Sequence, residues 1–98
     1  MAKSWIMELM EQHDPALAQL YSTNRDFAMQ DGAIPNKYKV LMTLLADALL
    51  GHAEGVKSIA QRARALGVSE EEICETLRVV YHFGGAPALI TGLNAFRQ

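Results

Sequence analysis

The amino-acid sequence predicts an all-α protein, a single-domain bundle of about six helices over residues 1–98. Two observations predict this class. Apolar residues recur every three or four positions over most of the chain, as on one face of a helix, and no stretch shows the strict alternation of a strand. Glycine and proline fall almost wholly between these apolar periods, where helices begin and end. A chain of 98 residues is enough for one domain.

The first two expected helices precede residue 32. A short amphipathic segment is expected near residues 4–11. Asp14 and Pro15 begin the second helix, because an aspartate can cap exposed backbone N–H groups and proline suits the first helical position. This helix is expected to stop near Asp31 and Gly32.

The next expected helix, from Pro35 to Gly51, is apolar on two sides. Six of its residues follow the spacing of one helix face: Tyr38, Leu41, Met42, Leu45, Ala48 and Leu49. Val40 and Leu44 widen that stripe onto a second face. Both faces need cover, and six short helices can hardly supply it within so small a monomer. We therefore expect the chain to form a homo-oligomer.

The second half of the chain predicts three more helices. One runs from Ala53 to Leu66 and is closed by Gly67. Ser69 and Glu72 form a capping box for the next, whose expected buried residues are Ile73, Leu77, Val80 and Tyr81. The segment 84–87 breaks this helix, and its final proline begins a last helix that carries Leu89, Ile90, Leu93 and Phe96.

Composition excludes several classes of function. The net charge is −2 and the basic residues are scattered, which argues against nucleic-acid binding. No apolar run approaches the roughly 18 residues of a membrane span, and the N-terminus lacks the pattern of a signal peptide. Cys74 is the only cysteine, so these residues hold no disulfide and no multi-cysteine metal site. A cytoplasmic protein is the expectation.

Three features, in this order and spacing, resemble one known family. They are Pro-x-Lys-Tyr-Lys at residues 35–39 before a long apolar helix, a polar-faced helix ending in Arg-Ala-Leu-Gly-Val at 64–68, and Ser-Glu-Glu-Glu-Ile at 69–73 followed, one helix later, by Gly-Gly-Ala-Pro-Ala-Leu at 84–89. Over about residues 14–96 the chain resembles the carboxymuconolactone decarboxylase / alkylhydroperoxidase D family. The resemblance implies an all-helical fold that assembles as a homotrimer or homohexamer.

The redox branch of that family carries a glutamate, a Cys-x-x-Cys pair and a histidine. The matching positions hold Val40, His52, Gly55 and Ile59. Three of these four side chains cannot carry a proton, and none is a thiol. The resemblance therefore implies a diverged member without the thiol peroxidase centre, for which we expect no cofactor. Peroxidase activity of the alkylhydroperoxidase type is the least favoured of the enzymatic alternatives.

His52, Asp47 and His82 are the candidate site residues. His52 stands at a helix start, where the family's first cysteine would be, and can titrate near neutral pH; it is either a general base or ligand-binding group, or a histidine in an interhelical turn. Asp47, amid leucines and alanines, is either an acid in a pocket or an ion-pair partner. His82 precedes the glycine turn and either lines the same pocket or packs under that turn.

Cys74 and Glu54 are weaker candidates for a functional site. Cys74 has acidic neighbours on its helix, which disfavour a thiolate, so a structural cysteine is the favoured interpretation. His52 and Glu54 lack a third ligand at useful spacing, so no metal site is expected. Two functions remain: an oligomer that binds a small carboxylated ligand or has no catalytic role, or a decarboxylase-like enzyme that uses His52, with Asp47 or His82, for proton transfer.

Overall fold

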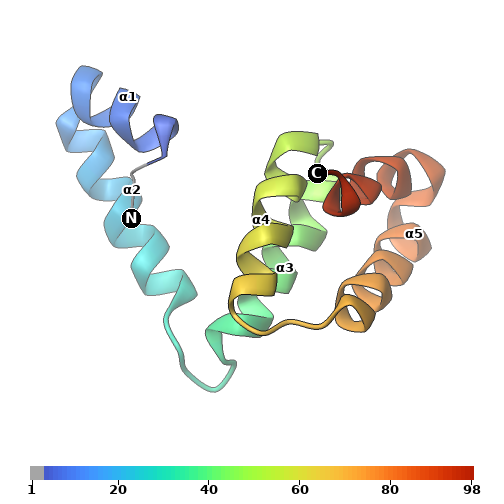
Figure 1. The fold of residues 1–98 in the computed structure, drawn as a ribbon. Helices are drawn as coiled ribbons and strands as arrows, with labels where there is room; N and C mark the ends of the chain where they lie inside the picture. Colours follow the sequence, from blue (N-terminus) through green and yellow to red (C-terminus); the bar gives the residue numbers. More distant parts are fainter. Residues whose placement is uncertain (1–3) are drawn as a thin grey trace. The chain divides into compact units, whose positions relative to one another are not determined.

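The protein is all-helical in a computed structural model that describes residues 4–98 (Figure 1). The helices are α1 (Trp5–His13), α2 (Pro15–Met29), α3 (Asn36–Leu49), α4 (Ala53–Ala65) and α5 (Glu70–Gly92), followed by a short 3-10 helix, η1 (Leu93–Phe96). No strand occurs among the described residues. The predicted fold class is confirmed, and the predicted helix boundaries agree with the observed ones to within about two residues as far as the start of α5.

The chain divides into two compact units, Met1–Gln30 and Asp31–Gln98, which are described separately. The single domain expected over residues 1–98 stays a prediction. In the first unit α1 and α2 pack together as a hairpin. Ser4 Oγ accepts a hydrogen bond from the Met7 amide at 3.2 Å, and Asp14 Oδ1 accepts one from the Leu17 amide at 3.1 Å. Both side chains therefore cap the helices they precede.

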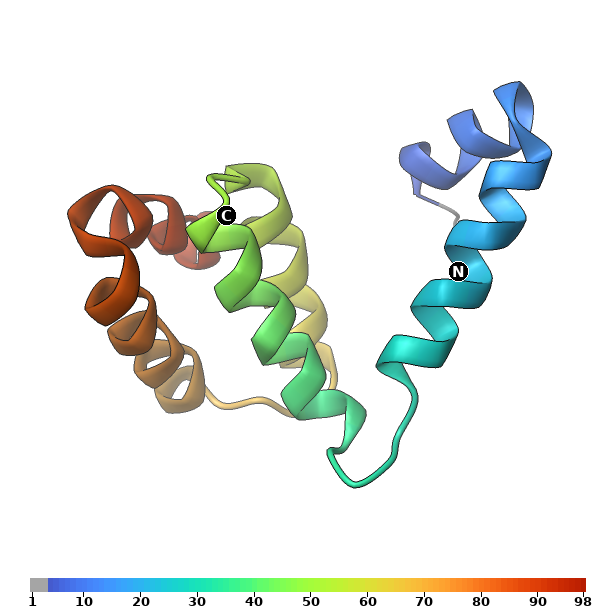
Figure 2. The same ribbon diagram turned by 180° about the vertical axis from the view of Figure 1, so that it is seen from behind.

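The second unit, which we call the core unit, is built around α3. Figure 2 shows α3 in front of α4, with α5 beside them. Val40, Leu44 and Ala48 form the buried face of α3, each with at most 1% of its surface exposed. The spacing did not say which of the two faces forms the core: Val40 and Leu44, assigned to the second face, lie at its centre together with Ala48 from the first. The reason is that a helix apolar on both sides gives no sequence signal for which side faces inward.

The other side of α3 is apolar and exposed. Tyr38, Met42 and Leu49 expose between 41% and 51% of their surface. These three residues lie at spacings of four and seven, so they share one side of the helix. We call them the outer face of α3. The prediction that α3 is apolar on two sides is confirmed, and within the core unit only one of those sides is covered.

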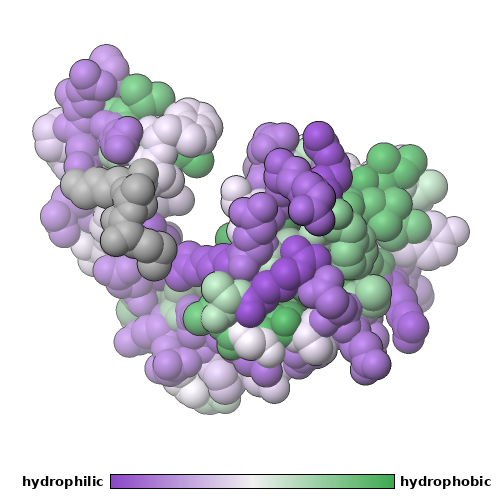
Figure 3. Space-filling model, viewed as in Figure 1, coloured by the Kyte–Doolittle hydropathy of each residue, from purple (hydrophilic) through white to green (hydrophobic). Residues whose placement is uncertain are grey.

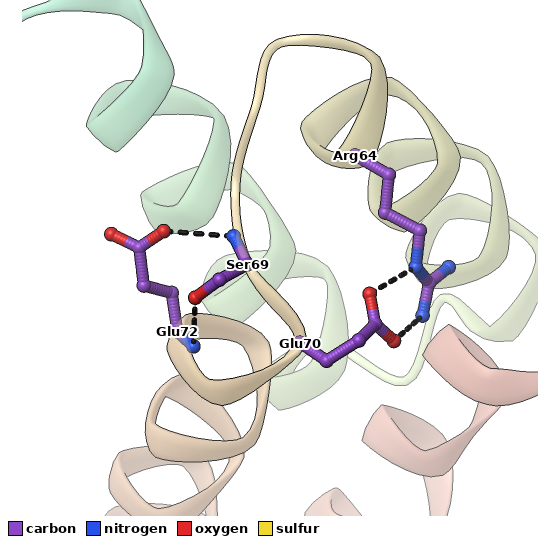
Figure 4. A network of polar contacts seen from close by, with 4 residues as sticks. All are labelled: Arg64, Ser69, Glu70 and Glu72. Carbon is purple, nitrogen blue, oxygen red and sulfur yellow. Dashed lines mark hydrogen bonds and ion pairs between the residues drawn. The ribbon is translucent and has the colours of Figure 1, made fainter.

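A glycine turn and a capping box join α4 to α5. Gly67 has a φ of +89°, and the Val68 amide donates a 3.0 Å hydrogen bond to the Ala63 carbonyl, which closes α4 as predicted. The Ser69 hydroxyl then accepts from the Glu72 amide at 3.1 Å, and the Glu72 carboxylate accepts from the Ser69 amide at 2.8 Å (Figure 4). This reciprocal pair is the predicted capping box.

Two glutamates at this junction are held in their charged form. The backbone hydrogen bond from Ser69 is the main cause that lowers the pKa of Glu72. A two-pronged hydrogen bond from Arg64, at 2.8 and 2.9 Å, lowers the pKa of Glu70 (Figure 4). Because both values lie below the ordinary value of 4.5, the two carboxylates stabilise the folded chain at neutral pH. That contribution is lost as the pH falls through the lowered pKa values.

Helix α5 consists of two segments joined by a kink at Gly85. This glycine has a φ of +73° and a ψ of −168°, a conformation that essentially only glycine adopts. A Cβ on Gly84 would lie 2.7 Å from Leu49 Cδ2, so α5 approaches α3 closely just before the kink. The segment beyond it is the last helix predicted from Pro87, which begins near the proline as proline geometry requires.

The predicted buried faces of α5 are right in part. Ile73, Leu77 and Val80 are buried as expected, whereas Tyr81 is exposed. Beyond the kink the small residues Ala88, Gly92 and Ala95 are buried, and Ile90, Leu93 and Phe96 are exposed. Small side chains let the second segment pack closely, so the larger ones point outward. The prediction that Tyr81 is buried is therefore wrong.

No helix among the described residues combines the length and the apolar character needed to cross a membrane.

Candidate functional site

The turn after α3 brings Asp47 and His52 together. Gly51 has a φ of +79°, and the His52 amide donates a 2.9 Å hydrogen bond to the Asp47 carbonyl while the Gly51 amide donates to the Ala48 carbonyl at 3.3 Å. These two bonds form a Schellman motif, which needs a glycine in the left-handed region. The motif places residue 52 directly beside residue 47. The backbone hydrogen bonds of the turn alone therefore bring the two residues together.

The two side chains meet at the surface of the core unit. His52 Nδ1 lies 3.4 Å from Asp47 Oδ1. The Asp47 side chain is 22% exposed, and the His52 side chain is 61% exposed. Asp47 is thus the partly buried carboxylate expected from its apolar neighbours, and it sits beside an imidazole that is largely in solvent. A carboxylate in this position orients the imidazole ring through its Nδ1 atom.

Gly55 makes room for the Asp47 carboxylate. A Cβ on Gly55 would lie 2.6 Å from Asp47 Oδ2, closer than real Cβ atoms come, and 3.0 Å from Cγ. The carboxylate therefore occupies the space that any side chain at position 55 would take. Gly55 lies in the first turn of α4, whose N-cap residue His52 makes no side-chain capping bond. Negative charge is favourable at this end of a helix, so Asp47 also stabilises the start of α4.

His82 is not brought into this pair. It is exposed, and its recorded contact is an edge-on packing against the Phe83 ring, with centroids 4.8 Å apart and planes at 77°. The expectation that it packs under the glycine turn is wrong, because its side chain is exposed. Among residues 4–98 the contacts of the candidate residues join His52 to Asp47 and leave His82 with Phe83.

The Asp47–His52 pair has the groups to transfer a proton or to bind a small anion. Neutral imidazole beside a carboxylate can accept a proton, and imidazolium can hold a small anion. In the described part of the chain, no three histidine, cysteine, aspartate or glutamate side chains gather in a way that could hold a metal ion. Cys74 is exposed on α5 and is not among the recorded contacts of Asp47 or His52.

Sequence reasoning paired His52 with Asp47 or His82 as candidate proton-transfer groups, but it did not predict the turn that joins Asp47 to His52, and it missed the role of Gly55. A signal for the first was present: a glycine just after a helix predicts that the next residue bonds back to the helix five residues earlier. The same inference was drawn for Gly67 but not for Gly51. No sequence signal marks Gly55, since its importance depends on the side chain of another helix.

The fold and this surface pair define a small all-helical protein with a carboxylate–imidazole pair at a helix junction. The family model described as Carboxymuconolactone decarboxylase family matches residues 15–98, and the chain belongs to this family. The helix α1 lies outside the matched region. No curated protein matches the chain.

Proposed function

We propose that this protein is a homo-oligomeric, non-peroxidase member of its family, which acts by binding and not by catalysis. The observation that carries the proposal is the outer face of α3. Tyr38, Met42 and Leu49 are exposed along the central helix of the core unit, on the side opposite the buried Val40 and Leu44. Contiguous apolar surface of this kind marks interaction sites in proteins.

A second copy of the chain is the partner that fits this face. Half of the residues are apolar, and association with further copies would add to the limited fraction of surface that a chain of 98 residues buries by itself. A closed, symmetric assembly covers the same face on every copy. The family resemblance favours a trimer or a hexamer.

Three features speak against a thiol peroxidase. Cys74 is the only cysteine in the sequence, so no resolving thiol is available within the chain. Val40, at the position of the family's glutamate, is fully buried and cannot relay a proton. At Gly55, the position of the second cysteine, the space for a side chain is filled by the Asp47 carboxylate.

Placing a charge on the outer face tests the proposal. Met42→Asp is expected to shift the particle mass from that of an oligomer to that of one chain, because an exposed aspartate resists burial in an apolar contact. Static light scattering gives the mass, and far-UV circular dichroism checks that the helices remain. Ser58→Asp is the control, since it adds the same charge to an exposed position on α4. An unchanged mass for Met42→Asp, or dissociation by both variants, would overturn the assignment of this face.

A decarboxylase-like enzyme acting on a small carboxylated substrate is the second candidate function. The 3.4 Å approach of His52 Nδ1 to Asp47 Oδ1 favours it, because such a pair can move a proton. In this alternative His52 is the general base or acid, and Asp47 orients it. His82 has no contact that places it with them. A neighbouring copy would have to enclose the exposed His52 ring.

An NMR titration tests this second candidate and the small-carboxylate ligand alike. Short mono- and dicarboxylates are expected to shift the His52 ring signals saturably and to leave the His13 ring signals unchanged. Asp47→Asn, which keeps the size of the side chain but removes its charge, is expected to change the response of His52. Ring signals of His52 that ignore every carboxylate would remove both ligand and substrate from this pair.

A further inference from the structure

A hollow lies in the core unit on the flank of α5, apart from Asp47 and His52. It is an open groove of about 280 Å³, and its lining is almost entirely apolar. The walls are Leu77 on the first segment of α5, Leu89 and Leu93 on or just after the second, and Phe96 on η1. Figure 3 shows hydrophobic surface gathered where Figure 1 draws the kinked end of α5. The groove thus exists because the kink at Gly85 folds the chain back beside its own helix.

Contacts of Arg64 position one wall of the groove. The Arg64 guanidinium is fixed by its two hydrogen bonds to Glu70 and lies over the Phe96 ring, 5.9 Å from the centroid. This cation–π contact positions the aromatic wall. The wall is therefore set by α4 and by the start of α5, and not by a ligand.

One charged side chain lines the groove, that of Arg78. Lys37 pairs with Glu72, and Arg64 pairs with Glu70, but the Arg78 guanidinium has no hydrogen bond or ion pair with any described residue. Glu71 and Glu75 share an adjoining hollow with Arg78 and are absent from the lining of the groove. Their negative charges lower the positive potential around Arg78, but they accept no hydrogen bond from its guanidinium. Tyr81, with its hydroxyl, lines the same groove.

We propose that this groove binds an amphipathic monocarboxylate with a hydrocarbon body of about eight carbons. The hydrocarbon would lie on the leucine and phenylalanine walls. Binding there is favourable because apolar surface is removed from water. The carboxylate would pair with the free guanidinium of Arg78, whose planar fork matches a carboxylate group. A groove of about 280 Å³ has room for a short hydrocarbon chain.

The test uses the full chain with labelled leucine methyl groups and octanoate as the probe. Octanoate is expected to shift the methyl signals of Leu77, Leu89 and Leu93 saturably, whereas octylamine, with the same body and the opposite charge, binds more weakly. Arg78→Gln is expected to weaken octanoate binding about tenfold or more, because charge-assisted hydrogen bonds are lost. Arg62→Gln, which removes an equally exposed guanidinium from α4, leaves the affinity unchanged.

Three results would overturn this proposal. The first is equal binding of octanoate and octylamine, and the second is an Arg78→Gln variant that binds octanoate as the parent chain does. The third is no response of the groove leucines, together with a lower particle mass for Leu93→Asp, which would show that another subunit covers the groove. Because the reporters are groove leucines and not the His52 ring, the outcome is independent of carboxylate binding at Asp47 and His52.

Discussion

Replacing Leu44 by alanine is expected to lower the free energy of unfolding by about 2–5 kcal/mol. Leu44 is completely buried on the inner face of α3, at the centre of the core unit. Its removal loses the transfer free energy of the side chain and leaves a cavity that neighbouring helices only partly fill. For a domain whose total stability is about 5–15 kcal/mol, this is a large fraction.

Urea denaturation followed by circular dichroism measures this change. Leu50→Ala is the matched control, because it deletes the same atoms at the end of the same helix, where the leucine is 70% exposed. We expect the control to change the free energy of unfolding by about 0.5 kcal/mol or less. Protein concentration is held fixed, since association would make apparent stability depend on it. Equal costs for the two variants would contradict the assignment of the inner face.

Replacing Gly55 by alanine is expected to destabilise the chain by about 1–3 kcal/mol when Asp47 is present and to stabilise it when Asp47 is absent. The destabilisation arises because the new Cβ would lie 2.6 Å from Asp47 Oδ2, which forces the carboxylate away from the start of α4. In an Asp47→Ala background there is no carboxylate to displace. The higher helix propensity of alanine then gains roughly 0.5–1 kcal/mol.

A double-mutant cycle of Gly55→Ala with Asp47→Ala measures this reversal of sign. Gly32→Ala is the control, because a Cβ there meets nothing within 4 Å. Its effect should be the same with and without Asp47. If Gly55→Ala also had one and the same effect in both backgrounds, Asp47 would not occupy the space beside Gly55.

The helices could be predicted from sequence because their ends carry local signals. Asp14, Gly67 and the Ser69–Glu72 capping box each act within a few residues of their own position, and each is found where predicted. The helix ends are therefore properties of short segments. The break near Gly85 was likewise marked by its run of glycines and by Pro87.

The faces of the helices could not be predicted equally well. On α3 the stripe of Tyr38, Met42 and Leu49 follows the same helical period as Val40 and Leu44, so periodicity alone does not decide which of the two faces the core. Beyond Gly85 the closely packed residues are small, and hydrophobicity ranks them below the exposed Ile90. Which face is buried depends on contacts between helices that lie far apart in the sequence.

The candidate site was found in part. Titratable groups in apolar surroundings pointed to Asp47 and His52, and the structure joins them through the turn at Gly51. His82 was grouped with them by resemblance to a family fold, and no recorded contact supports that grouping. The role of Gly55 depends on the position of a carboxylate from α3, which no local pattern reveals.

We propose that the outer face of α3 is covered by further copies of the same chain. Light scattering of the unmodified protein at micromolar concentration tests it most directly. We expect a single species with the mass of a trimer or hexamer of the 10.8 kDa chain. A mass equal to that of one chain would contradict it.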